Sequence, residues 1–310
     1  MRIGTRRSVL ALAQAQQVAQ MLRARAGVER CELVGVVTGG DRGAGAAEKS
    51  RWVDELERAL GAGEIDLAVH SAKDVPGELG DGLELLGAPA RAAAEDVLCG
   101  AGALEELPAG ARVGTGSVRR AAQLRAVRAD LEVVGVRGNV DTRLRKLDAP
   151  PAPGDGDATE RLDAIVLARA GLQRLGREHE IAGALAPERF VPAPGQGVLA
   201  LEGRAGDERA RAAVAAITDA DAFACLRAER ALARALAASC HTPLGAHAVP
   251  AGCGCLLLRA WVGLPDGSQW IGDELLGGFY DPPALGRRVA ERLLAVGAAE
   301  LLAHAEAMAA

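Results

Sequence analysis

The chain has 310 residues, of which 49% are apolar, and a formal net charge of -5. This length predicts two or three domains with substantial cores, and the acidic balance argues against a non-specific polyanion binder such as a DNA coat protein. The start carries no basic segment followed by an apolar run, and no stretch is apolar enough to span a bilayer. We therefore expect a cytoplasmic protein with mostly reduced cysteines and no membrane contact.

The first two-thirds of the chain alternates strand-like and helical runs. The expected strands are Arg2–Thr5, Glu32–Val37, Ile65–Val69, Leu83–Leu86, Arg112–Gly114, Leu131–Val136 and Ala164–Ala168. The expected helices are Val9–Arg25, Val53–Gly61, Val118–Arg128 and Val140–Lys146. This alternation is typical of βαβ units and a largely parallel sheet. A short echo, in which a strand, a Gly-Thr turn and a capping serine precede a helix, occurs at Ile3–Ser8 and Val113–Ser117, and it favours two similar α/β domains.

The last third has a different pattern, which predicts a separate small α+β domain. Pro150–Asp157 is expected to be a solvated loop, and Pro192–Gly197 is a second break. The elements expected after that break are a helix from about Ala220 to Ala238, strands Gly245–Val249, Leu256–Gly263 and Gln269–Leu276, and a helix Pro283–Ala295. The Pro265-Asp266-Gly267 turn should join the last two strands into a hairpin.

Ligands of open α/β sheets bind beyond the carboxyl ends of the strands, so the residues that follow each strand are the candidates for a site. Ser8 and Ser117 could be simple helix caps, and Arg120 and Arg143 could lie on solvated helix faces. Arginine after nearly every strand, however, predicts a rim that binds carboxylate or phosphate. The polar residues past strand ends are Arg6, Ser8, His70, Ser71, Lys73, Asp74, Thr115, Ser117, Arg119, Arg120, Arg137, Asn139, Arg143 and Arg174.

The segment His70–Pro76 combines an imidazole, a hydroxyl, an ammonium and a carboxylate. Only three of the 36 basic residues are lysines, so Lys73 suggests a site that needs a compact ammonium with an adjustable pKa. Asp74 beside it could act in acid–base chemistry or stabilise a cationic intermediate, or the two could form a structural salt bridge. No G-x-S-x-G motif is present, so a hydrolase triad is not indicated.

Cys240 follows the long helix and is flanked by Ser239 and His241. A loop cysteine beside a histidine can be a nucleophile or an attachment point, although a free cysteine is more often a small buried apolar residue. The six cysteines include no C-x-x-C pair, and a cluster of Cys253 and Cys255 with His247 is disfavoured, so we predict no metal.

Several motifs, in one order from Arg2 to about Ala303, together resemble the porphobilinogen deaminase (hydroxymethylbilane synthase) family. They are Arg2–Ser8, His70–Pro76, Gly114–Arg120, Val136–Leu144, Asp163–Ala168, Pro194–Gly197 and Glu229–Ala231. The resemblance implies two α/β domains like the halves of a periplasmic anion-binding protein, with the active site between them, and a small α+β domain that presents a cysteine. The implied domain limits are 1–89 with 192–215, 90–191 and 216–310.

The resemblance also implies a transferase of tetrapyrrole (haem) biosynthesis that acts as a monomer and binds no nucleic acid. Such an enzyme joins four porphobilinogen molecules head to tail, loses ammonia each time and releases hydroxymethylbilane. A dipyrromethane cofactor, held through a thioether bond to the residue matching Cys240, starts the chain. The substrate carries an acetate and a propionate, which agrees with a rim of arginines.

Carried over by motif, the implied site residues fall into four groups. The catalytic residues are Asp74, Arg6 and Lys73. The cofactor-binding residues are Cys240, Ser71, Lys73, Asp74, Thr115, Ser117, Arg119, Arg120 and Arg143. The substrate-binding residues are Arg6, Ser8, Gln14, Arg137, Asn139, Arg143, Arg174 and Gln196. The lid residues are Lys49 and Trp52.

The chain departs from the family pattern in three places. Ala238-Ser239 replaces the usual Gly-Gly before the cysteine, the lid reads Ala46–Trp52 without its glycines, and Gly39-Gly40-Asp41 lacks an arginine. Two other readings explain some of the same residues. A non-catalytic two-lobed anion binder would need neither Cys240 nor Asp74, and a nucleic-acid binder would use Arg119–Arg128, although aromatic residues are scarce.

Overall fold

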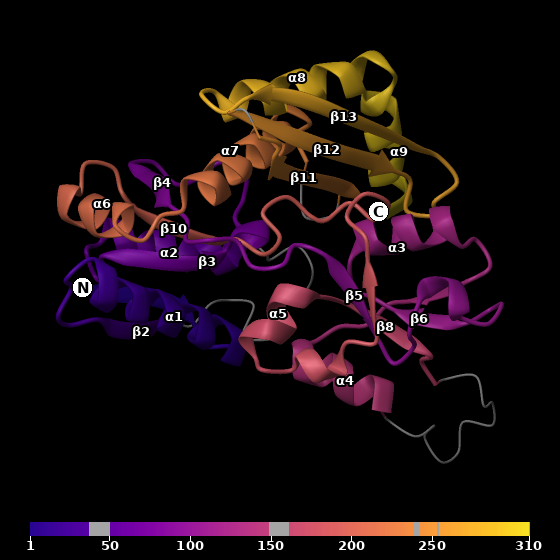
Figure 1. Ribbon diagram of the computed structural model, residues 1–310, viewed down its shortest axis with the longest axis horizontal. Helices are drawn as coiled ribbons and strands as arrows, with labels where there is room; N and C mark the ends of the chain where they lie inside the picture. Colours follow the sequence, from indigo (N-terminus) through magenta and orange to yellow (C-terminus); the bar gives the residue numbers. More distant parts are fainter. Residues whose placement is uncertain (37–49, 149–160, 239–241, 253, 310) are drawn as a thin grey trace.

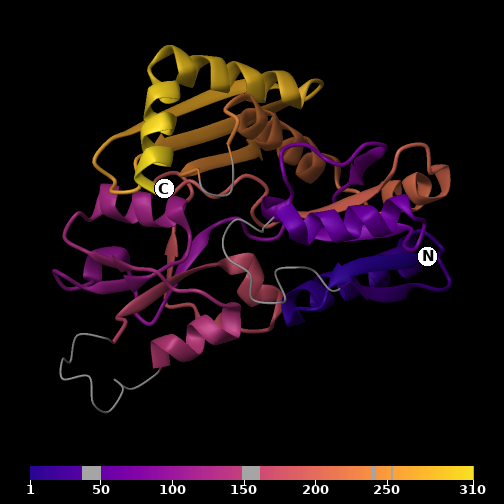
Figure 2. The same cartoon turned by 180° about the vertical axis from the view of Figure 1, so that it is seen from behind.

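The computed structural model describes residues 1–36, 50–148, 161–238, 242–252 and 254–309, except for the side chains of 50–52, 148 and 309. These residues form three bodies, each built around one sheet (Figures 1 and 2). Two α/β bodies lie side by side, and the C-terminal body covers both along one side. The predicted order of two α/β domains followed by a small α+β domain is therefore confirmed.

The first body has the strand order β2-β1-β3-β10-β4, in which β10 runs antiparallel to its neighbours. Val18 and Leu22 of one helix pack on one face of the sheet, and Leu56 and Leu60 of another pack on the opposite face with Ile65. Its elements are β1 (Arg2–Arg6), α1 (Val9–Arg25), β2 (Glu32–Val36), α2 (Ser50–Gly61), β3 (Leu67–Ser71), β4 (Leu83–Gly87), β10 (Leu199–Arg204) and α6 (Glu208–Ala215).

The second body repeats this plan with the order β7-β6-β8-β5-β9, in which β5 is the reversed strand. Leu124 packs on one face of this sheet, and Leu144 and Leu172 pack on the other. Its elements are β5 (Asp96–Cys99), β6 (Arg112–Gly114), α3 (Val118–Val127), β7 (Glu132–Val134), α4 (Val140–Asp148), β8 (Ala164–Ala168), α5 (Arg169–Arg174) and β9 (Gly183–Leu185).

In each sheet the reversed strand is the one that comes directly after a segment connecting the two α/β bodies. The chain reaches β5 through residues 88–95, and it returns through residues 186–198 to β10. The prediction of largely parallel sheets is confirmed, but both reversed strands were missed. β5 is buried at all four positions and β10 at five of six, so neither shows the alternation that marks a half-exposed strand.

The third body is an antiparallel sheet, β11-β12-β13, covered by helices on one face. Its predicted hairpin between β12 and β13 is present. The long helix ends three residues earlier than expected, and Ala237 beyond it has φ of 50°, in the left-handed region that favours glycine. The elements are α7 (Ala220–Ala235), β11 (Leu244–Pro250), β12 (Cys255–Gly263), β13 (Trp270–Gly278), α8 (Pro282–Ala295) and α9 (Ala298–Ala309).

A buried carboxylate joins the two connecting segments between the α/β bodies. Asp96, at the start of β5, has no solvent exposure and accepts hydrogen bonds from Arg119 Nη2 at 2.7 Å and Arg120 Nε at 2.9 Å. Gln196, in the returning segment, donates to the same carboxylate at 2.8 Å and to the Ala94 carbonyl at 2.7 Å. These bonds fix where the second sheet stands relative to the first.

A second buried carboxylate ties the C-terminal body to the same segments. Glu229 of α7 is fully buried and accepts from Arg91 Nη1 at 2.6 Å. It also accepts from the backbone N–H of Gly195 at 2.6 Å and of Ala248 at 2.7 Å. One side chain of α7 thus contacts both connecting segments and strand β11. Within the described ranges, no helix is long and apolar enough to cross a bilayer.

The Asp96→Asn substitution is expected to destabilise the protein by about 3–5 kcal/mol at pH 7, because two buried guanidinium groups lose their counter-charge. Burial alone would raise the pKa of Asp96, but Arg119 and Arg120 outweigh it and lower the pKa from 3.8 to about 2. The stabilisation is therefore complete above about pH 4 and is lost as the pH falls toward 2.

Urea unfolding at a series of pH values measures this effect. The variant should show a shallower loss of stability between pH 4 and pH 2 than the unsubstituted chain. Asp54, an exposed carboxylate of α2, provides the control, since Asp54→Asn should change stability by less than about 0.5 kcal/mol. Equal destabilisation by both substitutions would contradict the role of Asp96.

Candidate active site

The two predicted capping serines do cap their helices. Ser8 Oγ accepts a hydrogen bond from Ala11 N at 3.2 Å at the start of α1, and Ser117 Oγ accepts from Arg120 N at 3.4 Å at the start of α3. Each hydroxyl still has a proton to donate, because the cap uses only a lone pair. The structure therefore places both serines at strand ends with a donor available for an anion.

The segment that carries Lys73 and Asp74 differs from the prediction in one respect. Strand β3 extends to Ser71, so His70 and Ser71 belong to the strand rather than to the loop after it. Alternation then sends them to opposite faces of the sheet. His70 lies 2.8 Å from buried Glu202, away from the predicted site, whereas Ser71 Oγ accepts from Gln14 Nε2 at 2.8 Å.

Lys73 and Asp74 lie in a short 3-10 turn, Ala72–Asp74, directly after β3. Loss of hydration, together with the positive charge of Arg120, lowers the pKa of Lys73 to about 8, although Asp74 and Asp96 act in the opposite direction. The Lys73 side chain nevertheless keeps contact with solvent, so an anionic ligand can reach it.

The facing rim of the second body brings Arg143 into the electrostatic range of Asp74. Burial and the charge of Arg120 lower the pKa of Arg143, while Asp74 of the first body raises it. Arg143 Nε donates to the Gly138 carbonyl at 2.8 Å, which orients the guanidinium. Residues from strand ends of both α/β bodies thus act on one another, as the sequence predicted.

Two polar residues near Arg143 shape the loops of this rim. Thr115 is buried, and its Oγ1 accepts from Ser117 N at 3.2 Å. Asn139 Oδ1 accepts from Thr142 N at 2.8 Å and caps α4, while Arg137 beside it is exposed. The carboxylate-binding role predicted for Asn139 would therefore use its amide N–H, because the oxygen serves the helix.

Arg174, the last residue of α5, lies where the two α/β bodies meet. Its Nη2 donates to the Gly197 carbonyl at 2.7 Å, and burial lowers its pKa to about 10. Its Nε is buried and has no hydrogen-bond partner among the described residues. A buried charged donor without a partner is costly, so this atom is suited to an anionic ligand.

Arg119 and Arg120 are both buried, so the reading that placed Arg120 on a solvated helix face is wrong. Besides Asp96, Arg119 donates to the Val191 carbonyl at 2.8 Å and Arg120 to the Val166 carbonyl at 3.1 Å. Arg119 Nε has no partner within the described ranges. Most of their donors therefore serve the protein itself.

Nothing in the sequence indicated Asp96, the residue that organises these arginines. It stands beside Glu95 ahead of a short apolar run, and nothing in that pattern shows which acidic residue turns inward. Gln196, predicted to bind substrate, is buried and donates to Asp96. Its Oε1 is also buried without a partner in the described part of the chain.

The side chains of three predicted residues, Lys49, Trp52 and Cys240, are outside the described part of the structure. Lys49 and Cys240 lie outside the described residues, as do the predicted loop 150–157 and the 39–41 segment. Trp52 belongs to α2, but its side chain is not described. In the sequence, Cys240 falls between the end of α7 and the start of β11.

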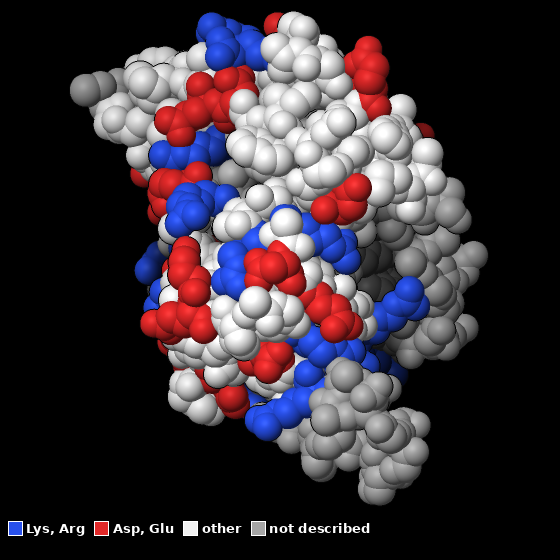
Figure 3. Space-filling model, turned by 90° about the vertical axis from the view of Figure 1, so that its right-hand side faces the viewer, with Lys and Arg blue, Asp and Glu red and all other residues white. Residues whose placement is uncertain are grey.

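The arginines of α3 do not form an outward basic surface. Arg125 donates to the Pro265 and Val133 carbonyls, and Arg128 pairs with Asp130 at 2.7 Å. On the face shown in Figure 3, basic and acidic side chains are interspersed. Arg125 and Arg128, which the nucleic-acid reading would use, are thus held by groups of the protein itself. Among the described residues, no His, Cys, Asp and Glu cluster is suited to hold a metal ion.

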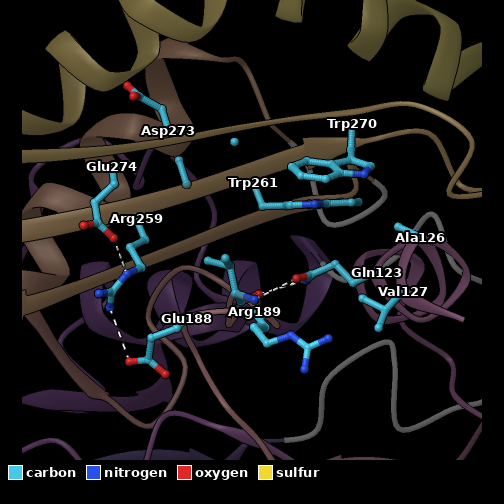
Figure 4. Close-up of a pocket in the computed structure, with 13 residues that line it drawn as sticks. Gln123, Ala126, Val127, Glu188, Arg189, Arg259, Trp261, Trp270, Asp273 and Glu274 are labelled. Carbon is cyan, nitrogen blue, oxygen red and sulfur yellow. Dashed lines mark hydrogen bonds and ion pairs between the residues drawn. The ribbon is translucent and has the colours of Figure 1, made fainter. Parts of the chain in front are cut away.

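A groove of about 530 Å³ lies elsewhere, between α3 and the C-terminal sheet. Figure 4 shows Trp270 of β13 lying beside Trp261 of β12, with Arg259 joined to Glu274 and Glu188. None of the predicted catalytic, cofactor or substrate residues lines this groove. The candidate site is instead the pair of facing rims around Lys73, Asp74 and Arg143.

Comparison with known families and proteins covers nearly the whole chain. The profile described as "Porphobilinogen deaminase, dipyromethane cofactor binding domain" matches residues 1–212, and "Porphobilinogen deaminase, C-terminal domain" matches residues 223–295. A porphobilinogen deaminase of Thiobacillus denitrificans is 43% identical over 97% of this chain and 97% of its own length. That of Stenotrophomonas maltophilia K279a is 44% identical over 97% and 98%.

Solved structures similar to the chain include a TRAP periplasmic solute binding protein from Ralstonia eutropha H16. It has a TM-score of 0.38 and 14% sequence identity, with coverage of 77% of this chain and 80% of that one.

The lowered pKa of Lys73 predicts selective acylation of this residue. In protein without bound anions, labelling of Lys73 by an amine-reactive ester should rise with a midpoint near pH 8, because the neutral amine is the nucleophile. Peptide mapping by mass spectrometry across pH 6–11 measures this, with Lys146 in the same sample as the internal comparison. A Lys73 midpoint near the ordinary lysine value of about 10.4 would contradict the assigned environment.

Proposed function

This chain belongs to the porphobilinogen deaminase family, and from that premise we propose how its own residues divide the work of the reaction. It is a transferase of tetrapyrrole biosynthesis. It condenses four porphobilinogen molecules head to tail on a covalently bound dipyrromethane cofactor, with loss of ammonia, and releases hydroxymethylbilane.

The residues on the two rims fit a dipyrromethane group. That group is a polycarboxylate, since each pyrrole carries acetate and propionate. The buried Nε atoms of Arg119 and Arg174 lack partners within the described ranges, and loss of hydration together with the charge of Arg120 lowers the pKa of Lys73 and of Arg143. Carboxylates of a bound ligand would supply acceptors for these Nε atoms and negative charge beside Lys73 and Arg143.

We propose that the cofactor carboxylates are held from both bodies. When bound, the cofactor supplies the pyrrole carbon to which the first substrate is joined. Lys73 would provide a compact ammonium, and Arg143 would provide a planar fork from the opposite rim. The remaining proposed contacts are Ser71, Asp74, Thr115, Ser117, Arg119 and Arg120, with Cys240 as the attachment point.

Asp74 is proposed as the catalytic carboxylate, and its location at the meeting of the rims is the observation that carries this assignment. It follows Lys73 in the turn after β3 and acts electrostatically on Arg143 of the second body. From there a carboxylate can stabilise positive charge that develops on a pyrrole nitrogen as ammonia leaves and as the new carbon–carbon bond forms.

The proposed substrate residues extend the same rims outward. Gln14 and Arg174 support this assignment through their positions, the first bonded to Ser71 and the second beside Gly197. An arriving porphobilinogen would place its carboxylates among these groups and its aminomethyl carbon near Asp74. The full proposed set is Arg6, Ser8, Gln14, Arg137, Asn139, Arg143, Arg174 and Gln196, with Arg6 and Lys73 assisting catalysis.

Several finer assignments remain predictions. They are the domain limits 1–89 with 192–215, 90–191 and 216–310, the lid residues Lys49 and Trp52, the monomeric state, the absence of nucleic-acid binding and the cytoplasmic location. The interspersed surface charges of Figure 3 support the prediction on nucleic acid.

Intact-mass measurement tests the attachment residue. The purified chain should carry an added mass equal to two linked pyrroles, and Cys240→Ala should lack it because no thioether can form. Cys31→Ala, which changes a half-buried cysteine of the first body, should keep the adduct. An adduct on the Cys240→Ala protein would refute the assignment.

Turnover of Asp74→Asn tests the catalytic carboxylate. The rate per adduct-bearing molecule should fall on the order of 10²-fold or more, because the amide cannot stabilise developing positive charge. Asp81→Asn, an exposed position after the same loop, should leave the rate unchanged. Unimpaired turnover by Asp74→Asn, with the adduct confirmed by mass, would exclude the proposed role.

A further inference from the structure

One face of α7 contacts the segment that carries Asp74. Leu226, Arg230 and Arg234 are spaced four residues apart, so they lie on the same side of the helix. Leu226 has no solvent exposure and belongs to a small apolar cluster with Ala72 and Val75, the residues on either side of the Lys73–Asp74 pair. The helix of the C-terminal body is thus packed directly against the proposed catalytic turn.

Arg230, one turn beyond Leu226, holds the backbone immediately after Asp74. Its Nη1 donates to the Val75 carbonyl at 3.3 Å, and its Nη2 donates to the Pro76 carbonyl at 2.8 Å and the Gly77 carbonyl at 3.0 Å. Arg234, one turn further, also donates from Nε to the Gly77 carbonyl. Three consecutive carbonyls therefore accept hydrogen bonds from a single guanidinium.

These contacts are suited to fix the position of Asp74. Val75 N donates to the Ala72 carbonyl at 3.2 Å and closes the turn that contains Asp74. The Arg230 guanidinium therefore binds the carbonyl of the same residue that closes this turn. Arg230 is only 9% exposed, and burial lowers its pKa to about 10, so it remains charged at neutral pH. Glu202 and Glu78 support that charge. Without the guanidinium, the Val75 and Pro76 carbonyls would lose these donors, and the segment would shift to find water.

The same helix leads to the proposed attachment cysteine. α7 ends at Ala235, and Cys240 follows five residues later in the sequence. We infer that Arg230 is a positioning residue that holds Asp74 in place through its hydrogen bonds to the Val75, Pro76 and Gly77 carbonyls. This inference rests on the proposed role of Asp74.

The first experiment compares Arg230→Met with Arg227→Met in the adduct-bearing enzyme. Arg227 lies on the same helix and is exposed, which makes it the matched control. Arg230→Met should keep the adduct and change KM by less than about twofold, yet lower kcat on the order of 10²-fold, as expected for a misplaced catalytic group. The kcat of Arg230→Lys should lie between the kcat of Arg230→Met and that of the unsubstituted enzyme, since an ammonium keeps the charge but not the planar fork of donors. Unchanged kcat per adduct-bearing molecule would overturn the inference.

A double-mutant cycle shows whether the effect passes through Asp74. In the Asp74→Glu background, where the carboxylate is already displaced, Arg230→Met should lower kcat much less than in the unsubstituted enzyme. Equal fold losses in the two backgrounds would mean that Arg230 acts independently of Asp74, and the inference would be wrong. If Asp74→Asn itself leaves kcat unchanged, the proposed function of Asp74 fails first, and the two failures remain distinguishable.

Chemical rescue covers the case in which Arg230→Met does not fold. Arg230→Ala, purified at low temperature, should regain at least several-fold of its lost kcat in millimolar methylguanidinium, because the free cation can occupy the vacated position between the carbonyls. Arg227→Ala should not respond. Recovery of thermal stability without recovery of kcat would show that Arg230 is only structural.

Discussion

The pairing of one buried carboxylate with two buried arginines underlies the arrangement of this molecule. Asp96 has no solvent exposure, and Arg119 and Arg120 are each 4% exposed, so none of the three charges could be buried without the others. Gln196, from the segment by which the chain returns to the first body, also donates a hydrogen bond to Asp96. Because the group stands where the chain passes between the two α/β bodies, the same contacts that satisfy the charges place the strand ends of the two sheets opposite one another.

A shortage of negative charge on these facing rims explains their chemistry. Asp96 carries one negative charge beside two arginines. Loss of hydration lowers the pKa of Lys73, Arg143 and Arg174, and the positive charge of Arg120 adds to this effect for Lys73 and Arg143. A ligand with several carboxylates restores the balance, and a substrate of the same type extends it. Asp74 lies on the same rims, where its carboxylate can stabilise a transient cation.

The C-terminal body contributes through α7, which contacts the rest of the molecule at two levels. Glu229 binds the connecting segments near Arg91 and Gly195, and Arg230, the next residue, binds the backbone that follows Asp74. Consecutive residues of one helix thus contact the junction of the bodies and the proposed catalytic turn.

The sequence by itself determined the class of fold, the strand ends that carry polar residues and, through its motifs, the family. Local patterns suffice for these features, because a glycine turn, a capping serine and helical periodicity act within a few residues. The tertiary structure alone decided that Asp96 turns inward, that His70 pairs with Glu202 rather than facing the site, and that Arg230 reaches the Val75–Gly77 carbonyls. These contacts join residues from 23 to 155 positions apart. Burial, which selects among many similar acids and arginines, exists only once the chain has folded.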